Sequence, residues 1–191
     1  MQKLVPTTWV VLILTVGSGS RADDQRLPAM HRIAILFKML TYDKNLKVRC
    51  RGGVRIGIVG LQGNDESLSV AKETLKAVSA GKTKKIEGLP IHAQLVEFRK
   101  PSDVWKAIDR SNLNILYLGP GLESHMKDIA RFSAMKKILI VTGESKYMSS
   151  GAALGITLHE GKPRILMHYK TASAQGAKFD LRITRIVERV D

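Results

Sequence analysis

Cysteine, acidic residues, aromatic residues and long apolar runs are all scarce in this chain of 191 residues. Cys50 is the only cysteine, so the chain forms no internal disulfide and its stability must come from a buried core. No apolar segment approaches the roughly 20 residues that cross a bilayer, so we expect no permanent membrane anchor. Aromatic residues make up only 5% of the chain and accompany no basic patch, which argues against a nucleic-acid-binding surface.

The first 22 residues follow the order of a secretory signal peptide. Lys3 supplies the positive charge, residues 9–16 form a short apolar core, and residues 17–20 interrupt it. Small residues at Ser20 and Ala22 suit signal peptidase, which predicts cleavage after Ala22. We therefore predict a signal peptide over residues 1–22 and a single exported domain over residues 23–191, with a buried N-terminal strand as the alternative reading of the first segment.

Basic residues outnumber acidic ones by 31 to 17, for a formal charge of +14. Loss of Lys3 and Arg21 with the signal peptide leaves about +12. A basic surface of this size suits nucleic acid, anionic lipid or an acidic protein face. Export makes nucleic acid the least expected of these partners, and the basic residues are scattered along the chain.

Apolar runs and amphipathic segments alternate along most of the chain. Helical spacing is found at residues 27–46, 64–81, 101–108 and 122–136, and short buried runs at residues 54–60, 91–98, 114–119 and 138–143. This alternation predicts an α/β fold with a mostly parallel sheet and helices on both faces. Residues 154–158 and 164–169 then predict a C-terminal β-hairpin, and residues 171–188 a terminal helix. Residues 81–90 are expected to form an unstructured loop.

No set of residues in the sequence indicates catalysis. The glycines of the first strand-to-helix turn are spaced G-x-x-G-x-x-G, which favours tight turning over dinucleotide binding. The serines near residue 145 do not form a G-x-S-x-G elbow, and no two histidines have the spacing of a helical metal pair. We therefore predict no enzyme, no cofactor and no metal.

Cys50 lies between Arg49 and Arg51, which would favour its thiolate if the side chain were exposed. A half-buried strand residue is one interpretation, and an intermolecular disulfide is the other.

The order of elements resembles the YfiR-like family of periplasmic proteins. The resemblance rests on the helix at residues 33–40, the strand at residues 56–60, the strand and turn at residues 141–145, the small residues 149–152 and the hairpin at residues 154–168. It extends over nearly the whole of residues 23–191. Three departures are Thr41-Tyr42-Asp43 in place of an aromatic–proline step, Ala152 in place of a second glycine, and His168 in place of an asparagine.

The resemblance implies a periplasmic regulator and not an enzyme. It further implies, from the best-known members, that the protein binds and represses an inner-membrane diguanylate cyclase, acts as a homodimer, and is sequestered by an outer-membrane or peptidoglycan-associated protein. A small-molecule binding module and a hydrolase with an unrecognised site remain alternatives. The predicted interaction residues are Ile33, Phe37 and Leu40 on the first helix, where core packing is the alternative, and Ser145, Ser149, Ser150 and Gly151 in the loop after a buried strand.

Overall fold

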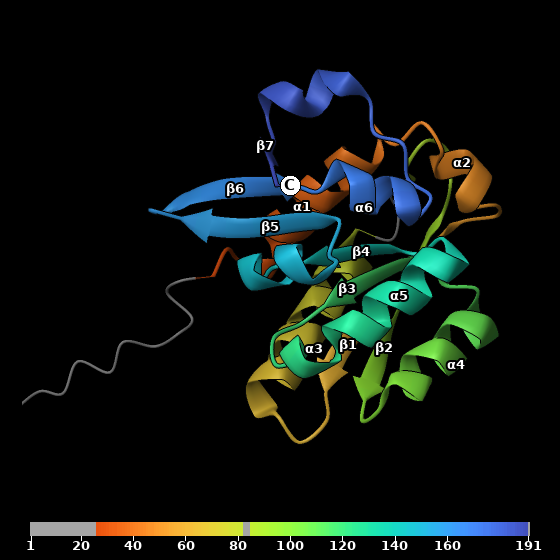
Figure 1. The fold of residues 1–191 in the computed structure, drawn as a ribbon, viewed down its shortest axis with the longest axis vertical. Coiled ribbons are helices and arrows are strands. Elements are labelled where there is room, and N and C mark those ends of the chain that lie inside the picture. Colours follow the sequence, from red (N-terminus) through yellow and green to blue (C-terminus); the bar gives the residue numbers. More distant parts are fainter. Residues whose placement is uncertain (1–25, 82–84, 191) are drawn as a thin grey trace, which may run out of the picture.

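A single seven-stranded sheet organises the protein (Figure 1). The computed structural model describes residues 26–81 and 85–190, so the predicted signal peptide lies outside the described residues. The strand order is β2-β1-β3-β4-β5-β6-β7. The strands are β1 (Val54–Leu61), β2 (Ile91–Phe98), β3 (Ile115–Leu118), β4 (Leu139–Thr142), β5 (Leu154–His159), β6 (Lys162–Met167) and β7 (Glu188–Arg189).

The predicted mostly parallel sheet and C-terminal hairpin are confirmed. The first five strands are joined by parallel pairings, and β5 and β6 form the antiparallel hairpin. Strands β1, β3 and β4 are buried along nearly their whole length, which explains why they appear in the sequence as uninterrupted apolar runs.

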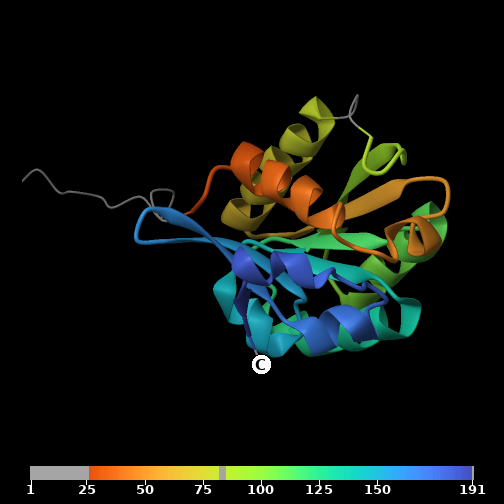
Figure 2. The same ribbon diagram turned by 90° about the horizontal axis from the view of Figure 1, so that it is seen from above.

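Helices cover both faces of this sheet, as expected. Helices α1 (Ala29–Leu40) and α3 (Asp65–Ala80) pack together on one face, and α4 (Pro101–Ser111) and α5 (Met126–Lys136) pack on the other (Figure 2). Alternate residues of each strand therefore enter two separate cores. Tyr117 of β3 faces α1 and α3, whereas its neighbours Leu116 and Leu118 face α4 and α5.

The order in which successive strands join the sheet reverses at β1, because β2 lies on one side of β1 and β3 on the other. In open α/β sheets such a reversal leaves a crevice at the carboxyl ends of the strands. Helix α3 starts there, and its N-cap is Asn64, whose side chain accepts a hydrogen bond from the Ser67 N–H. The Ser67 hydroxyl accepts the Leu61 N–H at 2.8 Å and donates to the Pro120 carbonyl at 2.6 Å, which ties the start of α3 to the carboxyl edge of the sheet.

The first predicted helix, over residues 27–46, is two helices instead of one. Helix α1 stops at Leu40, and a short helix α2 (Leu46–Arg49) follows after a turn. The Asp43 carboxylate causes the break, because its Oδ1 accepts the backbone N–H of Asn45 at 3.0 Å and that of Lys178 at 2.9 Å. These bonds fasten the turn to the C-terminal part of the chain, which a continuous helix would prevent.

The single terminal helix predicted over residues 171–188 is wrong. Helix α6 (Tyr169–Ala174) is short, a 3-10 turn η4 (Leu181–Arg185) follows, and β7 then pairs in parallel with β6. Gly176 has a φ of +85°, a left-handed conformation that ends the helix. The helical pattern in the sequence came from Phe179 and Ile183, which enter the core from separate turns.

The loop expected over residues 81–90 is ordered where it is described. Ile86 pairs with Leu89 in a tight turn, and the Ile86 side chain is buried in the core beneath α1 and α3. The buried Ile86 side chain packs this turn against the core.

Candidate functional site

The loop that was predicted as an interaction site forms the 3-10 turn η3 (Ser145–Ser150) after β4. Ser145, Ser149 and Ser150 are exposed, whereas Tyr147 and Met148 anchor the turn in the core. The Ser149 hydroxyl donates to the Lys146 carbonyl, and among the described residues no hydrogen bond joins any of the three serines to a histidine or carboxylate. The turn therefore offers an exposed polar surface and no activated nucleophile.

Gly151 closes this turn and has a structural part in it. Its φ is +108°, and a Cβ at this position would lie 2.4 Å from the Cβ of Ala130 on α5. Only glycine fits so close to the helix in this conformation.

The three α1 residues predicted as a contact surface lie mainly in the core. Ile33 and Leu40 are buried, and Phe37 is half-buried with its ring against Gly81 at the end of α3. This matches the core alternative left open by the sequence for Ile33 and Leu40. The exposed residues of α1, among them Met30, are the ones accessible to a partner.

Cys50 is neither a strand residue nor exposed. It follows α2, is fully buried, and is a free thiol. Its burial argues against the intermolecular disulfide, because a partner thiol cannot reach it in this fold. Burial also raises the pKa of the Cys50 thiol to about 11, against the opposing effect of Arg49.

We expect Cys50 to resist thiol reagents in the folded protein. At pH 8 the raised pKa lowers the thiolate fraction about 100-fold relative to an ordinary cysteine, and burial blocks access as well. The rate of reaction with a disulfide reagent at pH 8, measured in buffer and in denaturant, should rise by at least that factor on unfolding. Equal rates in the two conditions would contradict the burial of this side chain.

A buried arginine lies at the carboxyl edge of the sheet, where the sequence analysis had placed no functional residue. Arg32 projects from α1, is only 2% exposed, and its Nε and Nη1 atoms have no hydrogen-bond partner. Its guanidinium carbon lies 5.8 Å from the ring centre of Tyr117 on β3, and the Tyr117 hydroxyl is also buried without a partner. Two unpartnered polar groups therefore meet beneath α1.

Gly143, the residue after β4, makes room for both groups. A Cβ there would lie 2.9 Å from Arg32 Nη1 and 3.2 Å from the Tyr117 hydroxyl. Burial raises the pKa of Tyr117, although the nearby Arg32 cation opposes this rise. The hydroxyl therefore stays protonated over the physiological pH range and is available as a hydrogen-bond donor.

A second arginine bridges the elements around this edge. Arg26 Nη2 contacts Glu144 Oε1 at 3.0 Å, just after β4, and Glu66 Oε1 at 3.1 Å, in the first turn of α3. The Arg26 charge is therefore compensated by two carboxylates, whereas Arg32 has no ion pair among the described residues.

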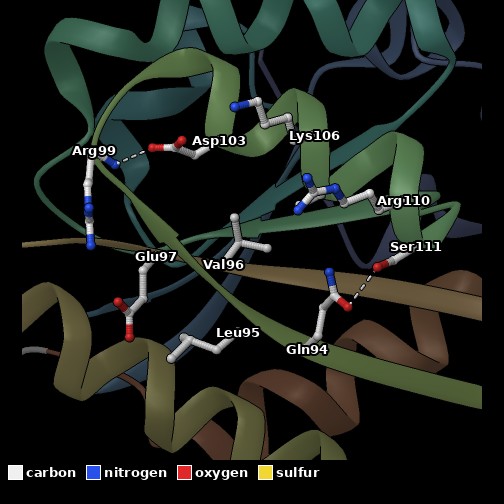
Figure 3. A pocket seen from close by; sticks show the side chains of 10 residues that line it. Gln94, Leu95, Val96, Glu97, Arg99, Asp103, Lys106, Arg110 and Ser111 are labelled. Carbon is white, nitrogen blue, oxygen red and sulfur yellow. Dashed lines mark hydrogen bonds between the residues drawn. The ribbon is translucent and has the colours of Figure 1, made fainter.

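A basic groove lies at the other side of the sheet, between the edge strand β2 and helix α4 (Figure 3). It has a volume of about 380 Å³. Lys106 and Arg110 extend from α4 over β2, and Arg99 follows the end of the strand. None of these three side chains forms an ion pair within the part of the chain that the structure describes. The Asp103 carboxylate accepts hydrogen bonds from the backbone N–H groups of Arg99 and Lys100.

The floor of this basic groove is the outer edge of β2, which pairs with no further strand among the described residues. The backbone carbonyls of Pro90 and Phe98 accept hydrogen bonds from N–H groups on the β1 side. The backbone N–H and C=O groups of the even-numbered residues of β2 therefore point toward β1. Because direction alternates along a parallel strand, the N–H and C=O groups of Ile91, Ala93, Leu95 and Glu97 point to the open edge. An open edge of this kind accepts an added strand from another chain.

The described residues contain no group of three metal-ligating side chains, and none of their helices is long and apolar enough to cross a membrane. Neither Arg32 nor the basic groove was predicted from the sequence, for different reasons. Arg32 could have been noticed as a charged residue in line with Leu36 and Met39 on the apolar side of α1. The basic groove depends on which strand lies at the sheet edge, and nothing in the sequence indicates that.

The fold defines the protein as an α/β domain with a mostly parallel sheet that helices cover on both faces. The model of the YfiR/HmsC-like family matches residues 32–187. The chain therefore belongs to the YfiR/HmsC-like family, which consists of periplasmic regulatory proteins. No curated protein matches the chain.

Solved structures with a similar fold are distant in sequence. A conserved domain protein from Vibrio cholerae has a TM-score of 0.60 at 12% identity, over 86% of this chain and 60% of that one. An ABC domain in complex with L-Trp from Streptococcus pneumonia has a TM-score of 0.61 at 9% identity, over 86% and 62%. A ligand-free, open substrate-binding protein with adhesive properties from Clostridium difficile has a TM-score of 0.54 at 14% identity, over 78% and 58%. The chain thus spans about three fifths of the length of these proteins, and the likeness shows the fold.

Proposed function

We propose that this protein is an exported periplasmic regulator that binds the periplasmic part of an inner-membrane diguanylate cyclase and represses it. Membership of the YfiR/HmsC-like family carries this proposal. The absence of an activated nucleophile at the exposed serines of η3 is consistent with regulation by binding. A protein without chemistry changes a receptor only by binding one of its states more tightly than the other.

The basic groove is the contact surface that we propose for this partner. Its three cations outnumber the carboxylates Glu97 and Asp103 in the lining and favour an acidic segment, and the open edge of β2 offers main-chain hydrogen bonds to a segment in extended conformation. The exposed serines 145, 149 and 150 and the exposed side of α1 are proposed as further contacts. A homodimer, and an outer-membrane or peptidoglycan-associated protein that sequesters the regulator, complete the proposal by the same family resemblance.

A complementation experiment tests both the function and the surface. Deletion of the gene should raise cellular cyclic di-GMP, and the wild-type gene should reverse the rise. The double variant K106E/R110E should fail to reverse it, because reversed charges repel an acidic segment and weaken binding by at least about tenfold. The matched control is K76E, which changes an exposed lysine on α3, on the opposite face of the sheet.

Immunoblots should show equal amounts of each variant in the periplasm. An unchanged cyclic di-GMP level in the deletion strain, with the protein expressed in the parent, would contradict the regulatory function. Full reversal by K106E/R110E would leave the function standing and exclude the basic groove as the contact surface.

A further inference from the structure

We propose that the partner's segment adds to the seven-stranded sheet as a further strand beside β2, and that its sequence alternates acidic residues facing α4 with apolar residues facing α3. The inference deepens the proposed function and rests on it for the identity of the partner. It adds the sequence pattern by which the basic groove recognises that partner's segment.

The sheet protects one of its edges and leaves the other open. At the far side, β7 covers the end of β6, and the rest of β6 contains Pro163, which has no N–H to donate. Strand β2 contains no proline and has no covering strand among the described residues. The outward N–H and C=O groups of Ala93, Leu95 and Glu97 are therefore placed to pair with a strand from another chain.

The cations of α4 are spaced to meet every second residue of such a strand. Because β2 and β3 both run parallel to β1, the helix between them runs back along β2 (Figure 1). Lys106 and Arg110 lie one turn apart on α4, which is about 6 Å along the helix axis. Alternate residues of a strand lie on one face and are about 6.6 Å apart. Two acidic residues with one residue between them can therefore each meet one of these cations.

The other face of β2 selects apolar residues. Ala93 and Leu95 point to the face that α3 covers, and both are only partly buried there. An added strand would place every second side chain beside them and cover their remaining apolar surface. Glu97 points away from α4, toward this same face (Figure 3), so a carboxylate on this side of the added strand would meet a like charge.

The charges argue against a second copy of this chain as the added strand. A symmetric antiparallel pair of β2 strands would place both copies of α4 on the same face of the joined sheet. The basic side chains of the two grooves would then face one another. On this face β2 itself presents His92, Gln94 and Val96, none of which is a carboxylate. An acidic segment of another protein is the occupant with complementary charge.

Titration calorimetry with synthetic peptides tests the pattern, on the protein expressed from its full gene and purified. The probe is Asp-Val-Asp-Val-Asp-Val with blocked ends, and its control is Asp-Asp-Asp-Val-Val-Val. The alternating peptide should bind at least about tenfold more tightly, because only its carboxylates all face α4. It should also slow hydrogen exchange at the amides of Ala93 and Leu95, but not at those of Gln94 and Val96, which face β1.

Methylation of the peptide's backbone nitrogens tests the strand addition itself. In a strand, the N–H groups of the aspartates point to one side and those of the valines to the other. Methylation of one set should abolish binding, and methylation of the other set, which faces away from β2, should not. The sensitive set is the aspartates if the added strand is parallel to β2 and the valines if it is antiparallel. An equal effect of the two methylations would overturn the proposal.

Charge-reversal variants separate this site from the proposed function. K106E/R110E should weaken binding of the alternating peptide at least about tenfold. The matched control K127E/R131E reverses two charges at the same spacing on the exposed side of α5 and should bind the peptide as wild type does. Equal binding of the two peptides, or no binding of either, would overturn the proposed pattern. The regulatory function is decided separately, by cyclic di-GMP in the deletion strain.

Discussion

Replacement of Asp43 by alanine should lower the free energy of unfolding by about 3–5 kcal/mol, because it leaves a buried cation without its partner. Asp43 Oδ2 accepts from Arg49 Nε at 2.8 Å, and the two side chains are 0% and 6% exposed. The same carboxylate accepts two backbone N–H groups that hold the turn after α1 to the C-terminal segment. The loss therefore combines an unpaired charge with two unsatisfied donors.

Denaturant unfolding of D43A measures this loss, with D109A as the matched control. Asp109 pairs with Lys136 at 2.9 Å on the surface, where the two side chains are 60% and 44% exposed. Exposed pairs of this kind contribute at most about 1 kcal/mol. A D43A protein as stable as D109A would show that the buried pair does not hold the α1–α2 turn.

The second large effect is expected for Gly151→Ala, which should cost about 2–5 kcal/mol of stability. A left-handed backbone costs an alanine roughly 1–2 kcal/mol, and the overpacking against Ala130 on α5 adds about 1–3 kcal/mol. The strain falls on the turn η3 that carries the exposed serines. The same denaturant measurement applies, with the NMR signals of the serines as a local readout.

Gly161→Ala separates these two contributions. Gly161, in the hairpin turn between β5 and β6, has a φ of +73° but has no atom within 4 Å of the added Cβ. It should therefore show the backbone cost alone, about 1–2 kcal/mol. Equal losses for G151A and G161A would mean that the contact with α5 relaxes freely and that η3 is not fixed by it.

These stability effects bear on function because the elements concerned carry the proposed sites. The Asp43 turn sets the end of α1, from which Arg32 reaches the sheet, and η3 begins one residue after Glu144. Variants used to test binding at either place should therefore be compared with D43A and G151A, whose effects are on folding.

Local patterns in the sequence determined the fold class and the main elements. The buried strands β1, β3 and β4 appear as apolar runs because both of their faces are covered, and β2 was predicted over its full observed length, residues 91–98. The hairpin followed from its glycine-containing turn. These features depend on neighbours in the sequence, which is why reading the chain alone recovered them.

Features that depend on residues far apart in the sequence come from the tertiary packing. The Asp43 carboxylate holds the turn after α1 by accepting the backbone N–H of Lys178, and the segment after α6 returns to pair as β7 with β6. Cys50 is buried by tertiary packing, which the two arginines beside it in the sequence do not indicate. Arg32 lies unpartnered beside Tyr117 and Gly143 only in the folded protein, because a side chain becomes an unpartnered donor only when the chain has folded around it.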